Sequence, residues 1–316
     1  MHDNSKLMML ATVSLVFIGL FIGLGLTADN YQYFLSRRIP KVLAIVLSGI
    51  AIAQSSLAFQ TITNNRILTP SIMGFDSLYL LIQVIIVVAF GRFSALILND
   101  YINFALSVVI MMSFSLILFS FYFRGEKQNL IGLLLLGVIL GQLFSNVSSF
   151  FIMLMDPNNF TVVQSNMFAS FNNINVDLVY LSTPLLILVV IGLYRMHNQL
   201  DVFWLDKDNA ISLGVDVKRV TMRVLVLSAT LIAISTALIG PIMFFGLLVT
   251  NLTRELFKTY QHKVLLSACS LLSIAALLSG EWIVENLFTF STTLSIVINF
   301  IGGTYFLSML LRNKVN

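Results

Sequence analysis

The sequence predicts an all-α polytopic membrane protein with about ten transmembrane helices. Of its 316 residues, 58% are hydrophobic and only 10% are charged, whereas a soluble domain carries about 25% charged residues. The apolar runs are continuous rather than alternating, which favours helices over a membrane β-barrel. Because one crossing needs about 20 apolar residues, we expect residues 1–316 to form a single transmembrane domain.

Runs with little or no charge predict the ten spans in order. We expect them at about 7–27, 41–60, 75–90, 101–121, within 128–155, and at 178–194, 221–239, 242–253, 264–284 and 294–311. Pro40 suits the first turn of the second span, and Gly240-Pro241 separates the seventh span from the eighth. The first run lacks a clear small-residue cleavage site, so we interpret it as a helix and not as a secretory signal.

One stretch, residues 195–223, carries five Lys/Arg and four Asp in 29 residues, more charge than any other stretch of that length. It follows six predicted spans, so it lies on the same side as both termini. If that side is the cytoplasm, most of the 18 Lys/Arg lie inside, as the positive-inside rule expects. The basic residues left outside are Arg37, Arg38, Lys41 and Arg92.

Patterns for catalysis or metal binding are scarce. The chain has no Gly-rich phosphate loop and no HExxH pattern, which weakens the case for an intramembrane enzyme, and we expect no catalytic residue. Its three histidines lack ligand spacing, so we expect no metal site. Ion-coupled transporters keep ionisable residues within their spans, and the candidates here are Asp76, Glu281 and Glu285. An ion-coupled secondary transporter or a channel is the weaker alternative.

Four stretches carry motifs in register with the predicted spans. They are RIPKVLAIVLSGIAIAQSSLAFQTITNNRILTPSIMG at 38–74, DNAISLG at 208–214, GPIMFFGLLVTNLTR at 240–254, and the C-terminal INFIGGTYFLSMLLR. In that order they resemble the RxPR…Q…N-P-L-x-x-P-x-x-L-G, E-x-A-x-S-L-G, G-x-I-x-F-x-G-L-x-x-P-H-x-x-R and G-x-P-x-F-x-x-L-L elements of the FecCD-type iron-siderophore and cobalamin ABC importer permeases.

The resemblance implies a type II ABC importer permease fold in a bacterial cytoplasmic (inner) membrane. Such a permease pairs with a second permease subunit, which we expect to be a different chain. Two separate ATPase subunits bind ATP and Mg, so no cofactor is expected in this chain. An extracellular or periplasmic substrate-binding protein delivers the cargo. We expect an iron(III)-siderophore, with cobalamin and haem as alternatives within the family, and no nucleic-acid partner.

The resemblance also implies roles for individual residues. The charged stretch, about 195–223, would be a cytoplasmic coupling segment. It would contact the ATPase through Asp208, Asn209, Ala210, Ile211, Ser212, Leu213 and Gly214. Locally, Asp208 or Asn209 suits a helix cap, Ala210 and Leu213 would face one side, and Gly214 would end the helix. The binding protein would dock on Arg38 and Lys41 with Arg37 adjacent, although lipid phosphates could hold these cations instead. The residues that would line the path or break helices are Gln60, Asn65, Pro70, Gly74, Gly240, Pro241 and Gly246.

The sequence departs from the family pattern at several positions. Thr250-Asn251 replaces the Pro-His pair, Arg66 replaces the proline of N-P-L, and Thr293-Leu294-Ser295 replaces a Pro-x-Gly. Glu285 stands where the family has an outer-face arginine that docks the binding protein. In a homodimer that positive charge would be lost twice, so we expect a heterodimer.

Overall fold

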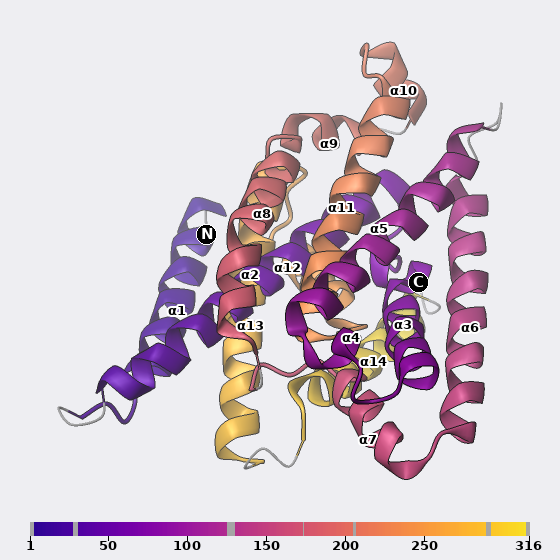
Figure 1. The fold of residues 1–316 in the computed structure, drawn as a ribbon. Helices are drawn as coiled ribbons and strands as arrows, with labels where there is room; N and C mark the ends of the chain where they lie inside the picture. Colours follow the sequence, from indigo (N-terminus) through magenta and orange to yellow (C-terminus); the bar gives the residue numbers. More distant parts are fainter. Residues whose placement is uncertain are drawn as a thin grey trace.

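The structure, a computed structural model, describes residues 3–27, 31–124, 130–172, 174–204, 207–288 and 292–313. These residues form α-helices, one 3-10 helix (η1) and no strand (Figure 1). The elements are α1 (Asp3–Gly23), α2 (Tyr31–Thr63), η1 (Pro70–Met73), α3 (Phe75–Phe90), α4 (Ala95–Leu98), α5 (Asp100–Arg124), α6 (Leu130–Leu154), α7 (Pro157–Asn166), α8 (Val176–Tyr194), α9 (His197–Phe203), α10 (Lys207–Ser212), α11 (Val217–Ile239), α12 (Phe245–Leu256), α13 (His262–Asn286) and α14 (Leu294–Asn313).

Each of the ten predicted spans corresponds to a helix. Seven described helices are long and apolar enough to cross a membrane: α1, α2, α5, α6, α8, α11 and α13. The other three spans are α3, which has the predicted bounds, the apolar α14, and α12 with 12 residues. The chain is therefore a multi-pass α-helical membrane protein. Figure 1 shows α9 and α10 at one end of the bundle, called here the α10 end, and α4 and α7 towards the other, called the α7 end.

The central helix is α2. In its most apolar stretch 83% of the residues are buried, compared with 11% in α1. Helices α11 and α13 pack along α2, with α8 and α12 beside it. In Figure 1, α1 and α6 stand at opposite edges of the molecule. The part of α2 from Pro40 to Ile62 is thus enclosed by most of the bundle.

The prediction that Pro40 begins the second span is wrong. Helix α2 starts at Tyr31, so Pro40 lies inside it. Proline cannot donate a backbone hydrogen bond, and here this leaves the Ser36 carbonyl without its usual helical donor. In the turns before Pro40, arginine side chains stack on aromatic rings. The Arg37 guanidinium lies 5.1 Å from the Tyr33 ring, and the Arg38 guanidinium lies 4.9 Å from the Phe34 ring.

Two glycines bring the start of α3 against α6. Gly74, between η1 and α3, has a φ of +91°, a conformation that glycine adopts without strain. A Cβ atom on Gly74 would lie 2.6 Å from the Cα of Gly141, so no side chain fits at this contact. Gly137, one turn earlier on α6, packs on Met73 in the same way. The break before α3 is therefore tightly packed.

Candidate functional site

The predicted ATPase-contacting segment forms a short helix at the α10 end. Helix α10 is closed by a Schellman arrangement, in which the Gly214 N–H donates to the Ile211 carbonyl and the Val215 N–H to the Ala210 carbonyl, at 2.9 and 3.0 Å. Gly214 has a φ of +80°, as this cap requires. The backbone geometry of Asn209–Gly214 is thus set by local hydrogen bonds.

Two details of the prediction for this segment are wrong. The helix begins at Lys207, so Asp208 and Asn209 lie within it and neither precedes it as a cap; the Asp208 side chain is outside the described part. Ala210 and Leu213 do not share a face, because Ala210 is fully buried and Leu213 is 63% exposed. The apolar side chain exposed with Leu213 is Ile211, at 60%.

A buried polar chain ties α9, just before this segment, to the central helix. The Asp201 carboxylate accepts from the backbone N–H of His262 at 2.6 Å, and its Oδ1 lies 2.7 Å from the ring Nδ1. On the other side of the ring, Nε2 lies 2.8 Å from Oγ1 of Thr61 on α2. Since a carboxylate only accepts, the Nδ1 proton faces Asp201 and Nε2 can accept from Thr61. His262 is fully buried, so α9 is anchored to both α13 and α2.

Trp204, the residue that follows α9, lies beside two arginine side chains. The guanidinium groups of Arg254 and Arg66 lie 5.0 and 5.9 Å from its ring, a stacking geometry that favours arginine. Arg254 also donates to Thr61 at 3.3 Å. Its Nε and Nη1 are buried and have no hydrogen-bond partner among the described residues.

Two of the departures from the family motif meet in space. The carbonyl of Arg66, which replaces the proline of N-P-L, accepts from the amide of Asn251 at 3.1 Å and from that of Gln60 at 2.8 Å. Gln60 also donates to Thr250 Oγ1 at 2.9 Å. Thr250-Asn251 therefore holds the connection between α2 and η1 through polar bonds.

The other residues predicted for the path or for helix breaks lie in two places. Asn65 and Pro70 belong to the connection that leads to η1, where the Asn65 side chain accepts from the Ile67 N–H at 2.9 Å. Gly240, with a φ of +92°, ends α11, and a Cβ there would lie 2.9 Å from the Cα of Ala169. The buried Pro241 follows it. Gly246 lies inside α12, where any side chain would collide with Ser56 of α2.

At the α7 end, Lys41 is surrounded by acceptors. Its Nζ lies 2.7 Å from Glu281 Oε1, contacts Glu285, and donates to the Asn172 side chain at 2.5 Å. Glu281 is 1% exposed and Lys41 is 13% exposed. The glutamate at the departure position thus pairs with a cation of the predicted docking group, inside the same chain.

The two arginines of this group are placed differently. Arg38 is half-buried and donates to the carbonyls of Ile22 and Leu24 at the end of α1, while Arg37 is exposed. A hollow of about 970 Å³ opens beside them. Besides Arg37, Arg38, Lys41 and Glu285, its lining includes the aromatic residues Phe21, Tyr33, Phe34 and Phe171.

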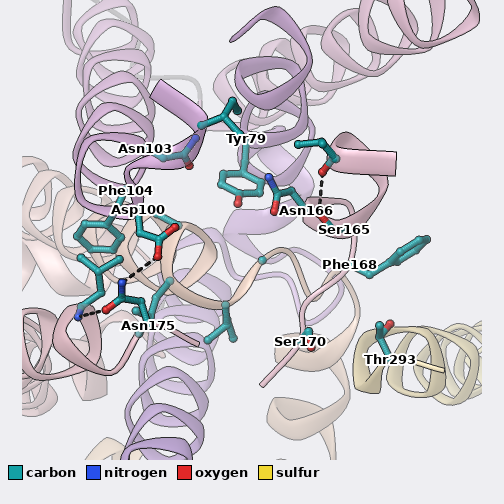
Figure 2. Close-up of a pocket in the computed structure, with 17 residues that line it drawn as sticks. Tyr79, Asp100, Asn103, Phe104, Ser165, Asn166, Phe168, Ser170, Asn175 and Thr293 are labelled. Carbon is teal, nitrogen blue, oxygen red and sulfur yellow. Dashed lines mark hydrogen bonds between the residues drawn. The ribbon is translucent and has the colours of Figure 1, made fainter. Parts of the chain in front are cut away.

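A second, polar pocket of about 470 Å³ lies near α7 (Figure 2). On one side, Asn175 donates to Asp100 at 2.8 Å. On the other, Asn166 of α7 donates to the buried Gln83 at 3.2 Å, and Asn103 exchanges two bonds with Gln83 at 3.1 Å. Figure 2 shows the Tyr79 ring close to Asn166. The network links α7 to α3 and α5.

Sequence reasoning missed the polar chain through His262 and the polar network around Gln83. It dismissed His262 because no metal-ligand partner stands at a suitable spacing, and it did not consider Gln83 or Asn103. The available signal was an isolated polar residue inside or at the edge of an apolar run, since such a residue needs a hydrogen-bonding partner.

Comparison with known proteins supplies a family and several relatives. The model of the FecCD transport family matches residues 6–312. The petrobactin import system permease protein YclO of Bacillus subtilis is 51% identical over 314 residues, with 99% of each chain covered. FatC of Bacillus anthracis, another petrobactin import system permease protein, is 33% identical over 311 residues, covering 96% of this chain and 88% of FatC.

Two solved structures share the fold. One, assigned to a metal-chelate type ABC transporter in an inward-facing conformation, has a TM-score of 0.84 at 23% identity and covers 98% of this chain and 99% of its own. PsaBC from Streptococcus pneumoniae in complex with Fab has a TM-score of 0.54 at 14% identity, covering 88% and 92%. At these identities the likeness shows a shared fold.

Proposed function

Because the chain belongs to the FecCD transport family, we propose that it is the permease subunit of a binding-protein-dependent ABC importer for an iron(III)-siderophore. The observation that carries the proposal is the 51% identity to a petrobactin import permease over nearly the whole of both chains. Petrobactin, named for both YclO and FatC, is the first cargo to test.

ATP hydrolysis belongs to a separate subunit in this proposal. The exposed Ile211 and Leu213 stand on a hydrogen-bonded turn. They form an apolar contact surface, called here the handle, that would enter a groove on the ATPase. Residues 195–223 would then be the coupling segment of a single permease domain. The Asp201–His262–Thr61 chain would hold that handle in register with α2 and so transmit motion between the ATPase and the membrane domain.

The partner permease is proposed to be a different chain. The names of the relatives support this, since Bacillus subtilis has two petrobactin import system permease proteins, YclO and YclN. Bacillus anthracis likewise has FatC and FatD. YclN is 24% identical to this chain over 323 residues, covering 98% of this chain and 96% of YclN. The pairing of Glu285 with Lys41 removes positive charge from the docking face, which a partner with standard residues could supply.

We place the α10 end in the cytoplasm of a bacterial cell, with both termini inside, on the strength of the charge distribution. The α7 end then faces the binding protein, and Arg37 is its most accessible candidate contact, with Arg38 beside it. The family resemblance places the cargo path near the breaks at Asn65–Gly74 and Gly240–Pro241, where irregular backbone within a membrane is tolerated. In this conformation Gly74 is packed against Gly141, so the passage of cargo there requires the break to open.

Reconstitution in proteoliposomes tests the proposal. The chain is combined with the second permease, the ATPase and the binding protein of its own genome, and uptake of radioactive iron–petrobactin is followed. We expect uptake that requires ATP, the ATPase and the binding protein. Uptake driven by an ion gradient without any ATPase would overturn the proposal. Uptake of haem or cobalamin in place of the siderophore would correct the cargo alone.

A further inference from the structure

Asp76 is a buried carboxyl group that the proposed transport mechanism does not use. It stands in the first turn of α3, is 5% exposed, and belongs to the packed break around Gly74. Both of its carboxyl oxygens are buried, and within the described residues neither accepts a well-formed hydrogen bond. The hydroxyls of Ser71 and Thr236 face the carboxyl group and offer it weak hydrogen bonds.

The elements packed around Asp76 bring no cation to it. In η1, α4, α6 and α7 there is no charged residue, and α3 has none besides Asp76. The cations of α11 occupy its first two turns, about 20 Å along the helix from Thr236 at 1.5 Å per residue. The charged residues of α5 stand at its two ends and are Asp100 and Arg124. The charged residues of α2 lie at the α7 end and are Arg37, Arg38 and Lys41.

An ionised carboxylate in such a place is disfavoured, because no counter-charge offsets its lost hydration and the two neighbouring hydroxyls offset only part of it. The positive end of α3 favours an anion, but Asp76 accepts no hydrogen bond from that end of the helix. A proton removes the charge and adds an O–H group that the Ser71 or Thr236 hydroxyl can accept.

A larger ligand has no room beside Asp76. The contact of Gly74 with Gly141 excludes even a methyl group at the break, and Asp76 lines neither of the two hollows described above. We propose that Asp76 is a proton-binding site inside the membrane domain and that it carries its proton in this conformation. Given the proposed function, which places this break beside the cargo path, opening of the break would release the proton and make import sensitive to pH.

Infrared spectroscopy tests the site without relying on transport. The full chain, with its partner subunits in lipid nanodiscs, is measured at neutral pH in H₂O and D₂O. We expect a C=O band of a protonated carboxyl that shifts on deuteration and disappears in Asp76→Asn. The band should persist in Glu281→Gln, since Glu281 is paired with Lys41, and in Asp177→Asn, since Asp177 is exposed.

A wild-type spectrum without that band, or a band of unchanged intensity in Asp76→Asn, would overturn the proposal. If Asp76→Asn does not fold, Asp76→Glu serves instead, because the longer acid should move the band, and an unmoved band counts against the site. Failure of the proton site leaves ATP-dependent uptake intact, whereas failure of the proposed function shows in the uptake assay and leaves the infrared result standing.

Discussion

At the outer end of α2, as we orient the chain, Lys41 is enclosed by two glutamates and an asparagine of the same chain. At the opposite end, Ile211 and Leu213 are about three-fifths exposed, above the buried contact of Asp201 with His262. The cation of the outer cluster is paired within the chain, against two carboxylates, whereas the turn at Asn209–Gly214 has a locally fixed backbone and leaves apolar surface open. Under the proposed function, Lys41 therefore contributes mainly to folding, and binding of the ATPase at the α10 end depends on apolar contact.

The largest effect is expected from Lys41→Met, which would break the outer cluster. Glu281, at 1% exposure, would be left as a buried charge without its cation, and this costs about 3–5 kcal/mol of unfolding free energy. Unfolding of the purified chain, followed by circular dichroism in denaturant, measures the loss. Lys41→Met combined with Glu281→Gln should recover most of it. If Lys41→Met alone is as stable as the wild type, Lys41 does not stabilise the cluster that it forms with Glu281 and Glu285.

The next effect is expected from Leu213→Asp, which places a charge on the exposed apolar handle. If Leu213 enters a groove on the ATPase, affinity for the ATPase should fall by about 30-fold, or about 2 kcal/mol, as for a central interface residue. Copurification and stimulation of ATPase activity report this. The matched control is Leu256→Asp, also exposed but at the end of α12. Equal loss in both variants would remove Leu213 from the interface.

A smaller effect is expected from Asp201→Asn beneath the handle. The carboxylate accepts two contacts from His262, and its neutralisation should cost about 1.5 kcal/mol, as for hydrogen bonds to a charged group. We expect ATP hydrolysis to continue while uptake per ATP falls, measured together in proteoliposomes. His197→Gln, which changes a ring that contacts the neighbouring Tyr194 through its carbonyl and its ring, is the control. Unchanged uptake per ATP in Asp201→Asn would show that the anchor is not needed for coupling.

The smallest effect is expected from Arg37→Ala on the outer rim. Exposed charges contribute about 0.2–1 kcal/mol, so binding-protein affinity should fall by about 1.4- to fivefold at low salt and less at high salt. Surface plasmon resonance across a salt series measures it. Arg92→Ala removes another outer basic residue that stands outside the family's docking positions and should change little. A loss independent of salt would argue against electrostatic docking.

Sequence reasoning recovered the spans well and the site unevenly. The bounds of α3 agree with the prediction, and Gly214 ends α10 as expected, because both depend on local pattern. The predicted second span starts too late, because a proline is typical of the first turn of a helix. In the structure α2 continues through Pro40, and arginine–aromatic stacking flanks the turns before it. The face of α10 was misassigned because burial of Ala210 depends on its neighbours in the fold.

By itself, the sequence determined that the chain crosses a membrane about ten times, since hydrocarbon requires continuous apolar helices. Its ordered motifs also determined the family, which the family match confirmed. Only the tertiary structure decided which distant residues meet: Lys41 with Glu281 and Glu285, Asp201 with His262, and Arg66 with Asn251. Contacts between helices depend on rotation and height across the bundle, and local periodicity does not encode these. The same packing buried Asp76 with no cation beside it.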